Sequence, residues 1–154
     1  MCRGSEEGCL RSEVGSQREE CVMAIYIINH QTFFMIKTVS DLEVFKLSYQ
    51  LAMEIFNFSR NFPKEERYSL TDQVVRSSRS VSANIAEGWG KRTYENEFKR
   101  HLVYAMGSLE ETKVWLYFSK DCKYLDVLVF EQLTAKYDEL GARIYKLFEN
   151  WKTL

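Results

Sequence analysis

The chain has 154 residues, with 21 Lys and Arg against 22 Asp and Glu, a net charge of −1 and 45% hydrophobic residues. This length fits one domain with a buried core, and the balanced charge excludes a strongly basic protein that coats nucleic acid by charge alone. Only seven Gly and one Pro interrupt the sequence, too few for the frequent turns of a many-stranded sandwich or barrel. The composition therefore favours helices.

The first 40 residues differ from the rest of the chain. Residues 1–22 are polar, rich in Gly, Ser and Glu, and aperiodic, which predicts disorder. Residues 23–36 form an apolar run that is shorter than the about 20 residues needed to span a membrane, so we expect no membrane segment. This run could touch a membrane surface or a partner, pack against the domain, or belong to an extraneous extension if translation starts at Met35. We favour a start at Met35, because the periodic sequence begins just after it, and predict an extension over 1–40 and a domain over 41–154.

The cysteines indicate a reducing compartment. Four Cys stand at positions 2, 9, 21 and 122, and three of them precede the predicted domain. Neither a CxxC pair nor a His at zinc-finger spacing accompanies them. We therefore expect no disulfide framework, no metal site and a cytoplasmic location.

Two segments in the first half of the predicted domain carry the 3.6-residue period of amphipathic helices. The first runs over 41–60 with Asp41 as its N-cap. The second begins at Ser69, which opens a capping-box pattern, and ends at Gly88, which suits the left-handed position after a helix. The predicted buried stripes are Phe45, Tyr49, Ala52, Phe56 and Ser59 in the first helix and Leu70, Val74, Ser77, Val81 and Ile85 in the second.

Two longer periodic segments follow. The third helix starts after an N-cap at Thr93 and reaches about Ser119, and the fourth covers 127–151. Their stripes step by 3 and 4: Phe98, Leu102, Ala105, Leu109, Thr112 and Leu116, then Phe130, Leu133, Tyr137, Leu140, Ile144, Leu147 and Trp151. Such steps are typical of helices packed at a shallow angle, and short joints make successive helices antiparallel. The sequence predicts an all-α fold, an antiparallel up-down-up-down four-helix bundle.

The third helix also carries apolar side chains outside its predicted buried stripe. They are Tyr94, Val103, Tyr104, Met106, Val114, Trp115, Tyr117 and Phe118. A monomeric bundle needs only one apolar stripe on each helix, so a second stripe indicates a subunit interface. The alternative is that these scattered aromatic residues help to fill the small core of a single subunit.

A recognisable motif runs through the second and third helices. It consists of Gln73, Arg76, Ser80, Asn84, Ile85, Ala86, Glu87 and Gly88, then Lys91 and Arg92, then Glu97, Phe98, Ala105, Gly107, Ser108, Leu109 and Glu111. The motif resembles the bacterial four-helix-bundle family of 23S rRNA intervening-sequence proteins, and the resemblance covers about residues 41–151. It implies a cytoplasmic bundle without catalytic activity that assembles as a homopentamer. The name of the family, whose genes can lie within insertions in 23S rRNA genes, makes rRNA or another nucleic acid a candidate partner.

Basic residues are concentrated in one part of this motif. Arg76, Arg79, Lys91, Arg92, Lys99 and Arg100 lie between positions 73 and 100, where only Glu87, Glu95 and Glu97 oppose them. One end of the bundle could thus be locally positive, and an oligomer would repeat that patch around a ring. We interpret these six residues as a candidate nucleic-acid-binding rim. The alternative is that they are solvated or paired with neighbouring carboxylates.

The other motif residues, Gln73, Asn84, Glu87, Gly88, Gly107, Ser108 and Glu111, are predicted to be structural. A polar residue at a helix seam usually fixes register and partner choice. In an antiparallel hairpin Arg76 comes near Glu111, which suggests an ion pair that clamps the two helices.

No residue pattern indicates an enzyme or a cofactor. Glu97 and His101 are four residues apart on one helix, but two ligands are too few for a metal site. The serines of the second helix have no His nearby in the sequence to act as a base, and no Gly-rich phosphate loop is present. The sequence therefore favours a non-enzymatic, homo-oligomeric bundle that binds structured RNA or DNA, with an assembly or scaffold protein without nucleic-acid contact as the alternative.

Overall fold

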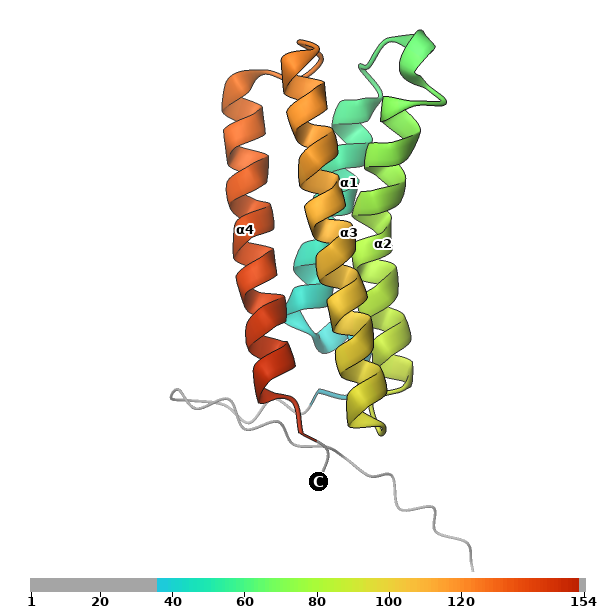
Figure 1. Cartoon of the computed structure of the whole chain (residues 1–154), viewed down its shortest axis with the longest axis vertical. Coiled ribbons are helices and arrows are strands. Elements are labelled where there is room, and N and C mark those ends of the chain that lie inside the picture. The colour runs from blue at the N-terminus through green and yellow to red at the C-terminus, as the bar shows by residue number, and fades with distance from the viewer. Residues whose placement is uncertain (1–35, 153–154) are drawn as a thin grey trace, which may run out of the picture.

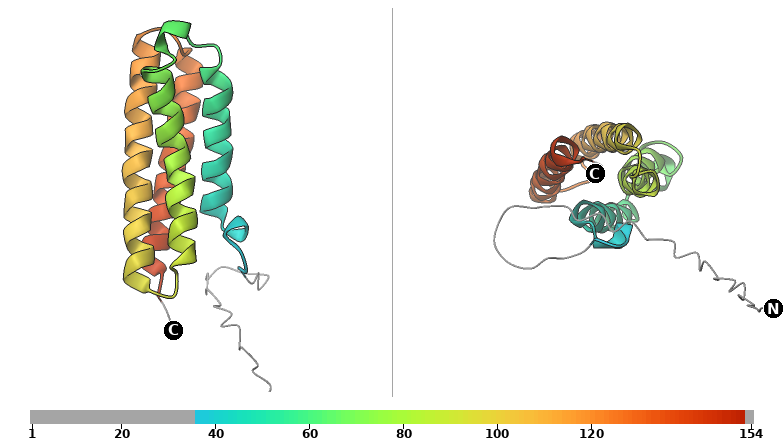
Figure 2. Two further views of the ribbon diagram at one scale, coloured as in Figure 1. Left: turned by 90° about the vertical axis from the view of Figure 1, so that its right-hand side faces the viewer. Right: turned by 90° about the horizontal axis from the view of Figure 1, so that it is seen from below.

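The computed structural model describes residues 36–152, which form an antiparallel bundle of four α-helices. The helices are α1 (Glu43–Ser59), α2 (Leu70–Gly90), α3 (Glu95–Asp121) and α4 (Val127–Asn150), with short 3₁₀ helices η1 (Val39–Asp41) and η2 (Lys64–Glu66). They run up and down along one long axis, as Figure 1 and Figure 2 show. This part of the chain contains no strand, so the predicted fold class is confirmed. The proposed start at Met35 and the polar and apolar stretches before it lie outside the described residues.

The core follows the predicted stripes in three of the four helices. Every stripe residue of α2 and α3 is buried, and in α4 only Leu147 remains partly exposed. None of the helices within residues 36–152 is both long and apolar enough to cross a membrane. The regular steps of 3 and 4 thus identified the inward faces of these helices correctly.

The predicted stripe of α1 is wrong. Tyr49 is exposed, and Phe45 and Phe56 are only partly buried. The helix instead buries a neighbouring face that shares Ala52 and Ser59 with the prediction and adds Val44, Ser48, Leu51 and Ile55. Both faces of α1 carry apolar residues, and the aliphatic face fits the interior while the rings lie on its flank.

The start of α1 also differs from the prediction. Asp41 is not the N-cap, because α1 begins at Glu43 with Leu42 in the cap position. The Asp41 carboxylate instead accepts the N–H groups of Thr38 at 2.8 Å and Lys37 at 3.0 Å, and so caps η1. These two bonds lower the pKa of Asp41.

Two further capping predictions need correction. Ser69 does occupy the N-cap of α2, but its side chain makes no cap bond and its hydroxyl donates to Glu66 instead. The capping box toward Asp72 is therefore not formed. For α3 the N-cap is Tyr94 rather than Thr93, one residue later than predicted.

Gly88 does not end α2, which continues to Gly90. It is buried where α2 meets α3, and a Cβ built on it would lie 2.7 Å from the His101 Cβ and 3.1 Å from the Phe98 Cδ2. A side chain at this position would force His101 or the helix backbone to shift. Gly88 is thus a close-packing residue inside the helix and not a helix terminator.

Replacing Gly88→Ala should lower the free energy of unfolding by about 1–3 kcal/mol, because the new methyl group overpacks the α2–α3 contact. Urea denaturation followed by circular dichroism measures this change. Gly90→Ala is the matched control, since no neighbour within residues 36–152 lies within 4 Å of its built Cβ. Equal stabilities of the two variants would contradict the packing role of Gly88.

Tyr137 offers a second test of the core. Its side chain is 1% exposed, and its hydroxyl has no hydrogen-bond partner among residues 36–152; burial raises the pKa of this phenol. Because an unsatisfied buried hydroxyl costs about 1–3 kcal/mol, Tyr137→Phe should raise the free energy of unfolding by about 1 kcal/mol. Tyr49→Phe, at an exposed ring, should change it by less than about 0.5 kcal/mol. A clear loss of stability in Tyr137→Phe would mean that the hydroxyl is bonded in solution.

Candidate functional site

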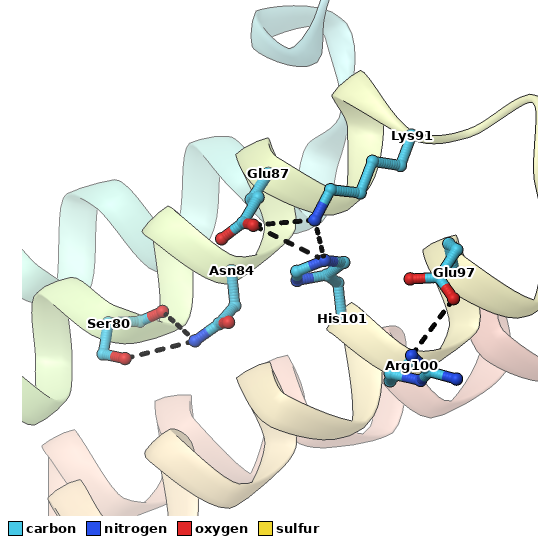
Figure 3. Close-up of polar contacts among 7 residues, drawn as sticks. All are labelled: Ser80, Asn84, Glu87, Lys91, Glu97, Arg100 and His101. Atoms are coloured by element: carbon cyan, nitrogen blue, oxygen red, sulfur yellow. Dashed lines mark hydrogen bonds and ion pairs between the residues drawn. The ribbon is translucent and has the colours of Figure 1, made fainter.

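The residues of the sequence motif gather along the contact between α2 and α3. Five small polar side chains, which we call the polar seam, line this contact: Ser77, Ser80, Asn84, Ser108 and Thr112. Ser108 Oγ donates to Ser80 Oγ at 2.9 Å, and Thr112 Oγ1 lies 3.0 Å from Ser77 Oγ. Asn84 Nδ2 donates to the hydroxyl of Ser80 at 3.1 Å and to its carbonyl at 2.9 Å, as Figure 3 shows. Two predicted structural residues, Asn84 and Ser108, are thereby joined through Ser80.

A three-residue polar cluster lies at the end of the bundle where α2 turns into α3 (Figure 3). Lys91 Nζ donates to Glu87 Oε1 at 2.8 Å and lies 2.9 Å from His101 Nε2. The hydrogen bond from Lys91 and the charge of Lys91 lower the pKa of Glu87. An ammonium group can only donate, so Nε2 of His101 accepts and the ring proton sits on the buried Nδ1, which has no partner in the described chain.

The remaining basic residues near this turn are also occupied. Lys99 Nζ pairs with Glu95 at 2.7 Å and Arg100 with Glu97 at 3.1 Å. Arg92 donates to the Trp89 carbonyl at 3.1 Å, and its guanidinium lies 4.5 Å from the centre of the Trp89 ring. Of the four cations among residues 91–100, three therefore have a carboxylate within a helical turn.

Arg76 and Arg79 do not belong to the same end. Arg76 precedes the last residue of α2, Gly90, by fourteen positions, which corresponds to about 21 Å along the helix axis. The six residues predicted as one rim therefore divide into two groups, which we call the basic turn (Lys91, Arg92, Lys99 and Arg100) and the arginine pair (Arg76 and Arg79).

The arginine pair borders a hollow of about 300 Å³ between α2 and α3. The residues that line it are Gln73, Arg76, Ser77, Arg79, Ser80 and Glu111. Two of the predicted structural residues, Gln73 and Glu111, thus lie beside predicted binding residues. The predicted Arg76–Glu111 clamp is wrong, because Arg76 lies 3.6 Å from Asp72 on its own helix and Glu111 accepts from Trp115 Nε1 at 3.3 Å. Arg76 pairs with Asp72 because Asp72 lies one turn away on the same helix surface.

Gly107 is exposed in the middle of α3, and no neighbour within residues 36–152 lies within 4 Å of a Cβ built on it. The contacts within the described chain give no packing reason for a glycine at this position. It differs in this respect from Gly88.

The sequence pattern did not reveal the partners of the seam or of His101. Ser77 and Thr112 were assigned only to apolar stripes, and His101 was considered with Glu97, which binds Arg100 instead. Among residues 36–152 no three His, Cys, Asp or Glu side chains gather as a metal site would require. The spacing of Ser77, Ser80 and Asn84 by three and four positions was the available signal, since it places polar groups beside the apolar face.

Comparison with known proteins identifies the family. The family model described as 23S rRNA-intervening sequence protein matches residues 40–146. A crystal structure of a protein of unknown function from the S23 ribosomal protein family of Bacteroides thetaiotaomicron superposes with a TM-score of 0.63 at 22% identity, covering 69% of this chain and 95% of that one. No curated protein matches the sequence. The similar structure supports the fold, and the match over residues 40–146 shows that the chain belongs to the 23S rRNA-intervening sequence protein family.

Proposed function

We propose that this protein is a non-enzymatic, cytoplasmic homo-oligomer that contacts structured RNA or DNA. The observation that carries the assembly part is the outward face of α3. Val103, Tyr104, Val114, Tyr117 and Phe118 are all about half exposed on this single helix. Aromatic and aliphatic groups concentrated on one helix face are typical of a surface that another subunit covers.

The basic turn supports the nucleic-acid part. Exposed ion pairs contribute only about 0–1 kcal/mol each, so the phosphates of a nucleic acid could replace the carboxylates opposite Lys91 and Arg100. Repetition of the turn in an oligomer would add weak contacts through effective concentration. Binding of this kind weakens steeply with salt, because it depends on the release of counterions.

The same ion pairs favour the second candidate, an assembly or scaffold protein without nucleic-acid contact. Glu87, Glu95 and Glu97 already neutralise three of the four cations in the basic turn. A surface balanced in this way attracts phosphates less than a row of unpaired Lys and Arg would. The two candidates share the assembly and differ only in the ligand of the basic turn.

The family resemblance implies five subunits, so the assembly part predicts a pentamer mass for the full chain by light scattering. Val114→Glu should shift the protein toward smaller species, because it buries a charge in the predicted interface. Val127→Glu is the matched control: it replaces an equally exposed Val in the first turn of α4, where a carboxylate is favourable. A monomeric wild type would contradict the assembly, and an unchanged Val114→Glu oligomer would exclude this face.

The nucleic-acid part predicts a salt-dependent gel shift with a 23S rRNA fragment. Replacing Lys91, Arg92, Lys99 and Arg100 together by Gln should weaken binding and make the salt dependence shallower, by about one unit of log–log slope for each phosphate that the variant no longer neutralises. Lys136→Gln combined with Arg143→Gln on α4 is the control for a general reduction of positive charge. Absence of binding by the wild type at low salt would favour the scaffold candidate, and equal binding by the quadruple variant would exclude the basic turn.

A further inference from the structure

The hollow beside the arginine pair is rich in hydrogen-bond donors. Arg76 and Arg79 belong to α2 three residues apart, so their side chains leave the same side of the helix. Gln73 and Ser80 add an amide and a hydroxyl to the wall. The carboxylate of Glu111 is the one charged acceptor among the six lining residues.

Neither guanidinium group of the arginine pair forms a hydrogen bond to a carboxylate within residues 36–152. Arg79 forms no ion pair within residues 36–152, and its guanidinium lies 5.3 Å from the centre of the Phe56 ring of α1. Stacking on a ring holds the plane of a guanidinium while leaving the N–H groups on its edge free. Arg76 is 71% exposed, and its 3.6 Å separation from Asp72 is too long for a hydrogen bond.

The hydroxyl of Ser80 is also able to donate. Its oxygen accepts from Asn84 Nδ2 and from Ser108 Oγ. A hydroxyl has two lone pairs and one proton, so with both lone pairs used its own proton remains for a ligand. The hydrogen bonds of the polar seam thus leave the Ser80 hydroxyl proton free to donate at the edge of the hollow.

We propose that this hollow binds a phosphate group. Two guanidinium groups, an amide and a hydroxyl offer more donors than the two oxygens of a carboxylate can accept, and they match the several oxygens of a phosphate. Arginine recognises phosphate through paired, charge-assisted bonds. The volume of about 300 Å³ lies at the small end of ligand pockets, which run from about 300 to 1,000 Å³.

Glu111 and the two arginines have opposite effects on the affinity of the hollow for an anion. Its carboxylate lines the same hollow and repels an anion, while the two arginines attract it. Neutralising Glu111 should therefore strengthen phosphate binding, whereas neutralising Arg79 should weaken it. A hollow that only exchanges solvent would respond to neither change.

Titration of the full-length protein with inorganic phosphate, followed by ¹H–¹⁵N NMR, tests the proposal. We expect saturable shifts of the α2 and α3 amides with a Kd of about 1 mM or below, at least a tenfold loss of affinity in Arg79→Gln, and a several-fold gain in Glu111→Gln. Arg79→Lys should bind less tightly than the wild type, because it keeps the charge and loses the paired geometry. Arg143→Gln, an exposed change on α4, is the control and should bind like the wild type.

Linear, non-saturating shifts in the wild type would overturn the proposal, as would equal affinities of Arg79→Gln and wild type when circular dichroism shows both to be folded. A loss of affinity in Glu111→Gln would also overturn it, since it would indicate a ligand that donates to the carboxylate.

The source of the phosphate is a separate question, and the proposal does not depend on nucleic-acid binding at the basic turn. Adding the 23S rRNA fragment to the phosphate-saturated protein distinguishes the sources. Displacement of phosphate that Arg79→Gln abolishes would identify a phosphodiester as the ligand. Retention of phosphate would identify a free phosphate or phosphate ester as the ligand. The gel shift would then test nucleic-acid binding at the basic turn separately.

Discussion

The close approach of α2 and α3 is the constraint on which the rest of the structure depends. Gly88 allows it at one end, where a methyl group would meet His101 at 2.7 Å. Further along the two helices, the hydroxyls of Ser80 and Ser108 lie at hydrogen-bond distance from each other, so the helices remain close there as well. Larger side chains at these positions would push the helices apart and break the hydrogen bonds of the seam. A glycine inside a helix costs about 0.5–1 kcal/mol relative to alanine, and the close packing that it permits offsets this cost.

This packing also decides what the charges can do. Glu87 and Lys91 pair along α2, and Glu95 and Lys99 pair along α3, because residues four apart share a helix surface. A stretch that is rich in Lys and Arg is therefore less positive in the folded protein than its composition indicates. Arg79 escapes this neutralisation, since it stacks on Phe56 rather than on a carboxylate. A cationic side chain with free donors is thus identified from the contacts that it makes in the fold, and not from the number of Lys and Arg in its stretch of sequence.

The sequence predicted the elements far better than their details, for identifiable reasons. Burial in α3 followed from an unbroken 3–4 pattern, whereas α1 carries two apolar faces and only packing could select Leu51 over Tyr49. Helix ends were missed by one or two residues, and at the start of α1 the reason is that the Asp41 side chain accepts from Thr38 instead of capping the helix. The Arg76–Glu111 clamp failed for the same reason, because a partner on the same helix needs no exact register between helices. The hollow could not be predicted, since it arises from side chains of two helices that pack without filling the space between them.

The outward face of α3 links the two proposed properties of the molecule. A glycine in a helix interior costs about 0.8–1.0 kcal/mol relative to alanine, and the described chain offers Gly107 no compensating contact. Gly107 and Glu111 are four residues apart and share one face of the helix, and Glu111 also lines the hollow. A subunit that packed closely over Gly107 would therefore lie next to the anion site. A ligand that binds differently to the free and assembled states shifts the equilibrium between them, so phosphate at Arg79 and assembly through α3 would be thermodynamically coupled.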